Sequence, residues 1–344
     1  MAPAPDLRAR AAPLLAALTP HPHRGPLIAA GALPLTVGVL LVNLRLDAQW
    51  GTGVFLVLDA LACALVLGMG VLAPSEGERP RSYQQVLLLC GLLLAFVTLL
   101  RVAQVLGADH PLSTAGSRTW IFVLVTLGAV WLTRVLHSAI FTLVAALAGI
   151  VMTLSFVQWA FAPKGLATAR WVLLALALVL VLAALSQRDR HRRESVYLID
   201  GAGIAIALLG LTFLAALFFP LQVLGFDGAA PGGGWKLVLL AGGLGSIAYA
   251  GVDREPGPAY IGAVDLLLFV ALAALPGAGG ASLWFWPLVL ALAGAAMIAA
   301  GLRPRRPLPP EPSSGSGPVE PVPGPGSAER SSLWAFPTDR PPGA

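Results

Sequence analysis

The stretch TARWVLLALALVLVLAALSQRDRHRRESVYLID, residues 168–200, decides the fold. Its first part, 168–187, is an apolar run whose only charge is Arg170. That run is long enough for one helix to cross a bilayer core, which needs roughly 20 residues. The arginine-rich segment 187–195 then ends the run, and a second apolar run begins at residue 196. The stretch therefore predicts two transmembrane helices joined by a basic loop.

The composition of the whole chain agrees with this prediction. Of the 344 residues, 57% are hydrophobic and only 11% are charged, and the mean hydropathy is +0.81. Soluble domains carry about 25% charged residues, so that class is excluded, and disordered chains are poor in aliphatic residues. A transmembrane barrel would show alternating segments of about ten residues. The long unbroken apolar runs instead predict an all-α, polytopic bundle of transmembrane helices.

Ten apolar runs are bounded by charges, by Pro or by Gly clusters. The predicted spans are 27–44, 52–73, 84–106, 119–136, 138–162, 168–187, 196–224, 235–252, 259–276 and 282–302. The weakest boundary lies between the fourth and fifth spans, where only residues 134–138 interrupt the run. Small residues recur at intervals of four in the eighth span, at Gly242, Ser246 and Ala250, a spacing that lets helices pack closely.

The distribution of basic residues predicts the orientation of these spans. With both termini inside, the cytoplasmic side receives Arg8, Arg10, Arg24, Arg79, Arg81, Arg134, Arg188, Arg190, Arg192, Arg193, Arg254, Arg303, Arg305 and Arg306, which is fourteen. The outer side receives Arg45, Arg118, Lys164, Arg170 and Lys236, which is five. Cytoplasmic loops carry an excess of Lys and Arg, so ten spans with cytoplasmic termini satisfy the rule. Fusing the fourth and fifth spans would place the cluster 188–193 outside.

The same charges predict the surroundings of the protein. The net charge of +5 lies mostly on the predicted cytoplasmic face, where it favours anionic lipid rather than nucleic acid. Only two of the 22 basic residues are Lys, which with the excess of Ala, Gly and Pro is typical of a GC-rich bacterial genome, so a bacterial inner membrane is expected. Residues 1–26 form a cytoplasmic segment without a cleavage site, in which 7–18 is either an interfacial helix or a poorly ordered terminus.

Four ionisable residues lie within spans and are candidates for substrate or ion coupling: Asp59, Arg101, Asp200 and Asp265. A buried Asp that gains and loses a proton can couple transport to an ion gradient. The alternative is structural, because each Asp lies in the N-terminal half of its helix, where the macrodipole favours a negative charge. Arg101 either extends to the headgroups or pairs with Asp59, which is predicted at a comparable depth on the preceding span.

Residues 303–344 form a separate cytoplasmic tail in which twelve of 42 residues are proline. Such a composition cannot form a core and predicts disorder. Two features of this tail are candidates for docking a protein partner: the proline-rich RPRRPLPP with Pro304 and Pro307, and SLWAF with Trp334 and Phe336.

No motif for hydrolase, nucleotide or metalloprotease chemistry occurs in the chain, so neither an enzyme nor a cofactor is expected. The five His residues are scattered and predict no metal site. Cys63 and Cys90 lie in apolar stretches and are expected as free thiols. Two functions remain: a transporter or permease that uses Asp59 or Asp265, and a non-catalytic scaffold that recruits a partner through its tail.

Residues 141–214 begin FTLVAALAGIVMTLSFVQWAF and contain LIDGAG at 198–203. This segment resembles uncharacterised multi-span membrane proteins of actinobacteria, grouped loosely with the domain-of-unknown-function 2157 type. The resemblance covers about a third of the chain and implies a multi-span membrane protein. It assigns no role to any residue, because none is established for such proteins.

Overall fold

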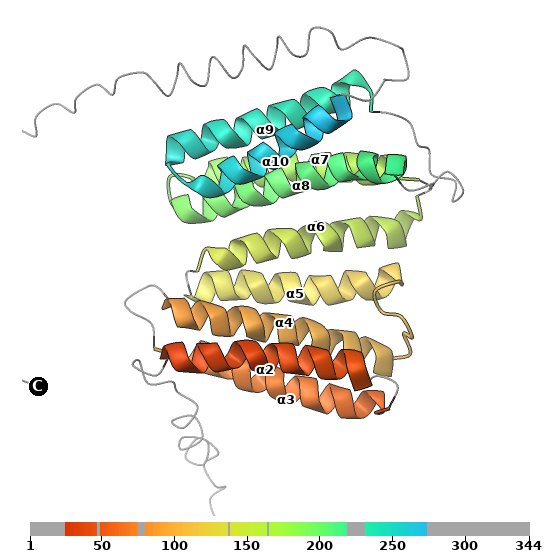
Figure 1. Cartoon of the computed structure of the whole chain (residues 1–344), viewed down its shortest axis with the longest axis vertical. Helices are drawn as coiled ribbons and strands as arrows, with labels where there is room; N and C mark the ends of the chain where they lie inside the picture. The colour runs from red at the N-terminus through yellow and green to blue at the C-terminus, as the bar shows by residue number, and fades with distance from the viewer. Residues whose placement is uncertain are drawn as a thin grey trace, which may run out of the picture. The chain divides into compact units, whose positions relative to one another are not determined.

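The computed structural model describes residues 25–46, 49–74, 80–136, 138–163, 165–218 and 231–273. Within these ranges the chain is helical and contains no strand (Figure 1). The helices are α2 (Gly25–Leu46), α3 (Thr52–Leu72), α4 (Ser82–Val105), α5 (Ala115–Leu136), α6 (Ile140–Phe161), α7 (Ala167–Gln187), α8 (Arg192–Phe218), α9 (Gly233–Asp253) and α10 (Pro256–Ala273). All nine are long and apolar enough to cross a membrane. The prediction of an all-α, multi-pass membrane protein is confirmed.

The nine helices correspond to the first nine predicted spans. The doubtful boundary is a real one, because α5 ends at Leu136 and α6 begins at Ile140. The largest shifts of a helix start are four residues: α5 begins at Ala115 rather than at residue 119, and α8 begins at Arg192 rather than at residue 196. Glu194 in its first turn is favoured there by the helix macrodipole. The tenth predicted span, the N-terminal segment and the proline-rich tail all lie outside the described residues.

Four pairs of consecutive helices make the most extensive contacts: α3 with α4, α5 with α6, α7 with α8, and α9 with α10. Members of each pair lie next to each other in Figure 1. Helix α2 packs on α3 and α4, while α8 also contacts α6, α9 and α10. The starts of α4, α6 and α8 line one cavity, and the starts of α8 and α10 line another. We call this end of the bundle the basic end. It is the end at which α4, α6, α8 and α10 begin, and it includes Arg188 and Arg190 between α7 and α8 and Arg192 and Arg193 at the start of α8.

The outward faces of the helices are apolar. Leu27, Leu44 and Leu267 are 75%, 79% and 70% exposed, although water would make such exposure unfavourable. In a bilayer these side chains contact hydrocarbon instead. The polar side chains Asn43, Asp59, Gln84 and Asp265 are buried between helices. Apolar side chains thus lie outside and polar side chains inside, the reverse of a soluble protein. This distribution is the one expected of a membrane-embedded bundle.

Close packing of α8, α9 and α10 depends on residues without bulky side chains. A Cβ atom on Gly262 of α10 would lie 2.6 Å from the backbone oxygen of Gly243 on α9. A Cβ atom on Gly203 of α8 would lie 2.6 Å from Ile261 of α10. Small residues allow helix backbones to approach each other in membranes. Of the three small residues that recur at intervals of four on α9, Ser246 and Ala250 are buried and Gly242 is half-buried, with a Cβ position 2.6 Å from Ile206 of α8.

Candidate functional site

Asp59 and Arg101 belong to one buried network, and Asn43 joins them. The Asn43 side chain donates a hydrogen bond from Nδ2 to Asp59 Oδ1, at 2.8 Å. The Asn43 Oδ1 atom accepts one from Arg101 Nε, at 2.9 Å. These three residues come from α2, α3 and α4, and all are buried. The network therefore ties three helices together and places a cation near the Asp59 carboxylate.

The Arg101 guanidinium has further partners within the protein. One of its terminal amines donates to Gln104 Oε1 at 2.7 Å, and its central carbon lies 4.6 Å from the centre of the Phe55 ring. A cation over an aromatic face is attracted by the ring quadrupole. Arg101 is only 8% exposed, so it is held inside the bundle rather than extended toward the headgroups. Asn43 links Arg101 to Asp59.

Asp265 has a different environment. It lies in the first half of α10, is fully buried, and neither of its carboxylate oxygens has a hydrogen-bond partner among the described residues. On the same helix, Gly262 packs against α9 and Leu268 packs against Gly210 of α8. An ionised carboxylate without a partner is very costly in such surroundings. Its charge has to be neutralised by a proton or by a cation.

Asp200 of α8 is also buried, and its side chain lies beside the first turn of α10. Its Oδ2 atom is 2.9 Å from the position that a Cβ on Gly257 would occupy. Gly257 is the second residue of α10, so the carboxylate faces a helix N-terminus, where negative charge is favoured. The sequence suggests, as one alternative, a structural role for Asp200, in which a helix N-terminus stabilises its negative charge. That role has a physical basis here, although the N-terminus is that of α10 rather than that of α8.

A cavity of about 400 Å³ connects Asp200 with the basic end. Its lining includes Arg193, Tyr197, Asp200, Glu255 and Gly257. Asp265 lies eight residues beyond Gly257 on α10, which is about 12 Å at the rise of an α-helix. The carboxylates of Asp200 and Glu255 thus line a cavity at the end of the bundle. The carboxylate of Asp265 lies roughly two helical turns deeper.

The four candidates within the spans do not form a single site. Asp59 and Arg101 lie on α3 and α4, which pack mainly against each other and against α2 and α5. Asp200 and Asp265 lie on α8 and α10, which pack on each other and on α9. The candidate docking residues Pro304, Pro307, Trp334 and Phe336 lie outside the described residues.

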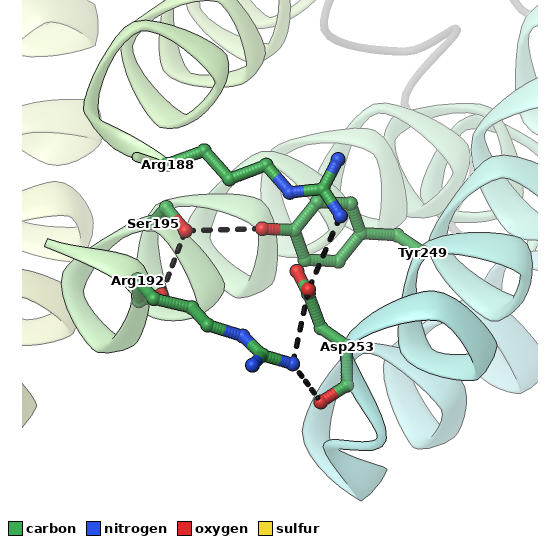
Figure 2. Close-up of polar contacts among 5 residues, drawn as sticks. All are labelled: Arg188, Arg192, Ser195, Tyr249 and Asp253. Carbon is green, nitrogen blue, oxygen red and sulfur yellow. Dashed lines mark hydrogen bonds and ion pairs between the residues drawn. The ribbon is translucent and has the colours of Figure 1, made fainter. Parts of the chain in front are cut away.

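Asp253 is the centre of a polar cluster that the sequence does not reveal (Figure 2). Its Oδ1 atom lies 3.2 Å from terminal amines of both Arg188 and Arg192, and its backbone oxygen accepts a 2.8 Å bond from Arg192. Ser195 and Tyr249 share a hydrogen bond of 3.0 Å beside these ion pairs. The cluster fastens the end of α9 to the loop between α7 and α8. Asp253 was missed because it lies one residue beyond the predicted eighth span.

Replacing Asp253 by Asn is expected to lower the free energy of unfolding by about 1.5–3 kcal/mol, the range for a hydrogen bond to a charged group. Both arginines lose their charged partner, but they are partly exposed and can turn to water. Thermal unfolding of the purified protein in detergent measures the change. Asp189→Asn in the same loop is the control, because no described residue forms an ion pair with Asp189. Equal stability of Asp253→Asn and the unchanged protein would contradict this role.

Within the described ranges, no group of three or more His, Cys, Asp or Glu side chains is arranged to hold a metal ion. Cys63 on α3 and Cys90 on α4 are free thiols. Comparisons with protein-family models, with curated proteins and with solved structures find no match to this chain. The likeness of residues 141–214 to the domain-of-unknown-function 2157 type therefore stays a proposal. What the chain supports on its own residues is a multi-pass membrane protein with nine described spans.

Proposed function

We propose that the protein is a cation- or proton-coupled transporter of a bacterial cell membrane, with both termini in the cytoplasm and Asp265 as the coupling residue. One observation carries this proposal: a fully buried carboxylate in a spanning helix, with no hydrogen-bond partner on either oxygen among the described residues. Intramembrane carboxylates of this kind mark ion and proton pathways. Asp59 is the weaker candidate, because Asn43 and Arg101 already balance it.

The cavity at the basic end supplies an entrance for a cation. Asp200 and Glu255 line it together with Arg193, so the two carboxylates outnumber the one cation and attract cations from the cytoplasm. A cation that leaves this cavity reaches Asp265 after about 12 Å along α10. Binding there removes the unfavourable charge of the carboxylate and alters the packing of α8, α9 and α10. Coupled transport requires that the ion-bound and the ion-free protein differ in conformation.

The test uses the purified full-length protein in liposomes adsorbed on a solid support, where steps in pH, Na⁺ or K⁺ produce charge-displacement currents on binding. We expect the unchanged protein to respond to one of these ions. Asp265→Asn is expected to remove at least about nine-tenths of the displaced charge, because an amide cannot take up a proton or neutralise a cation. Asp200→Asn is expected to shift the half-saturating ion concentration upward.

Asp253→Asn is the matched control, since Asp253 is a buried carboxylate at the same end that is paired with two arginines. Its displaced charge should equal that of the unchanged protein. A full response from Asp265→Asn, or no response of the unchanged protein to any of the three ions, would reject the coupling role. The scaffold alternative depends on residues 303–344, which lie outside the described residues.

A further inference from the structure

A second cavity, of about 530 Å³, lies at the basic end and shares Arg193 and Tyr197 with the cavity that contains Asp200. It is bounded by Pro80 and Gln85 at the start of α4, by residues 138–140 at the start of α6, and by residues 191–194 and Tyr197 at the start of α8. Helices converge on it with their N-terminal ends. Its size matches sites for small molecules, which span about 300–1,000 Å³.

Helix N-termini face this cavity with their positive ends. The first four N–H groups of a helix have no partner inside that helix and attract anions, above all phosphate. Helix α6 has 22 residues, and its N-cap residue is Ala139, which has no side chain that could cap those groups. Helix α8 begins at Arg192 in the same wall. On α6 the N–H groups of Phe141 and Thr142 donate to the Ser138 and Ala139 carbonyls, and on α8 that of Ser195 donates to the His191 carbonyl. The N–H groups of Ala139 and Ile140, two residues in the cavity wall, are the α6 donors left for a ligand.

Ser138 provides an independent sign that a ligand binds here. This residue lines the cavity, is only 2% exposed, and its Oγ atom has no hydrogen-bond partner among the described residues. Buried polar groups in proteins are nearly always hydrogen-bonded, so one that is not requires an explanation. An acceptor atom placed in the cavity beside the α6 N-terminus would take the hydroxyl hydrogen of Ser138.

The charged side chains of the wall favour an anion. Arg193 forms no hydrogen bond or ion pair with another described residue, whereas Arg192 is committed to Asp253. His191 also lines the cavity and is exposed. Glu194 is the opposing charge, and it stands in the first turn of α8. Arg188, Arg192 and Arg193 are positive and Asp253 and Glu194 are negative, so the wall and the adjoining ion-pair cluster together carry a net charge of +1 besides the helix ends.

We propose that this cavity binds a phosphate group through the α6 N-terminus, the Ser138 hydroxyl and the Arg193 guanidinium. A phosphate has enough oxygen acceptors for amide, hydroxyl and guanidinium donors at once, and charged hydrogen bonds of this type are strong. The phosphate belongs either to the headgroup of an anionic phospholipid or to a free phosphate compound. The proposal does not depend on the coupling role of Asp265, because Asp265 does not line this cavity, although Arg193 and Tyr197 also line the cavity of Asp200.

The test measures the binding of two probes to the purified full-length protein in neutral detergent. One probe is dioleoylphosphatidylglycerol in mixed micelles, with dioleoylphosphatidylcholine as the neutral lipid. The other is inorganic phosphate, compared with chloride at equal ionic strength. Arg193→Gln is expected to weaken binding about tenfold or more, and Ser138→Ala about threefold to tenfold, as the loss of single hydrogen bonds implies. Glu194→Gln is expected to tighten binding.

Arg190→Gln is the matched control, because Arg190 is exposed in the same loop but does not line the cavity. It should bind both probes as the unchanged protein does. Binding of phosphatidylglycerol alone identifies a lipid headgroup, and binding of inorganic phosphate as well identifies a free phosphate compound. The proposal is overturned if neither probe binds, or if Arg190→Gln weakens binding as much as Arg193→Gln. The melting temperature of each variant is also measured in the neutral lipid. An unchanged value shows that a loss of binding is not caused by unfolding.

Discussion

Replacing Arg101 by Met is expected to lower the free energy of unfolding by about 3–5 kcal/mol, the cost of removing one partner from a buried charged network. Met keeps much of the length of the Arg side chain, so the expected loss is electrostatic rather than a matter of volume. Arg101 bonds Asn43 at 2.9 Å, and Asn43 bonds Asp59 at 2.8 Å. Without the guanidinium, the fully buried Asp59 carboxylate loses the nearby positive charge and keeps its hydrogen bond to the neutral Asn43 amide.

A double-mutant cycle tests this network directly. Asp59→Asn removes the charge that Arg101 balances, so the double variant should be more stable than the two single losses added together. Residues in one such network show interaction energies of about 0.5–3 kcal/mol. Arg45→Met is the control, because Arg45 is exposed on α2 and should change stability by no more than about 0.5 kcal/mol. Strictly additive losses would show that Asp59 and Arg101 do not depend on each other.

The number and limits of the helices could be predicted because apolar length is a local property. Each run of roughly 20 apolar residues has to cross the bilayer as a helix, whatever its neighbours are. The boundary between α5 and α6 illustrates this: the sequence predicted separate spans 119–136 and 138–162, and in the structure α5 ends at Leu136 and α6 begins at Ile140. The start of α8 was misplaced by four residues because Arg192, Arg193 and Glu194 are charged but still continue the helix.

The partners of the buried charges could be predicted only in part. Equal depth on consecutive spans suggested that Asp59 and Arg101 could pair, and the structure places them in one network. Asn43 gave no sign of its role, because an Asn at a helix end usually faces headgroups or water. Its contribution depends on how α2 packs on α3 and α4, which periodicity does not determine.

Asp59 and Asp265 looked alike in the sequence, since both are single carboxylates well inside apolar helices. In the structure they differ in the polar side chains that the neighbouring helices place around each carboxylate. Helices α2 and α4 bring Asn43 and Arg101 to Asp59, whereas no described residue of α8 or α9 hydrogen-bonds Asp265. The distinction between a balanced and an unbalanced carboxylate is therefore tertiary. The anion cavity at the basic end is likewise tertiary, because it joins residues from three separate loops.

Replacing Gly262 by Ala is expected to lower the free energy of unfolding by about 2–3 kcal/mol, within the range for overpacking a close contact. The added Cβ would lie 2.6 Å from the Gly243 backbone oxygen and 2.9 Å from Ile247. A side-chain atom can rotate away, but a backbone oxygen moves only with its helix. Helices α9 and α10 would therefore have to separate, and Asp265, three residues further along α10, would lose part of its enclosure.

Gly245→Ala on α9 is the matched control, because a Cβ atom there would meet nothing within 4 Å. In that variant only the intrinsic preference of Ala over Gly for the helix remains, which raises stability by up to about 1 kcal/mol. Thermal unfolding of both variants in the same detergent separates the steric effect from that preference. If Gly262→Ala were as stable as Gly245→Ala, the space between α9 and α10 would accommodate the added methyl group. The enclosure of Asp265 would then have to depend on α8 rather than on the contact between α9 and α10.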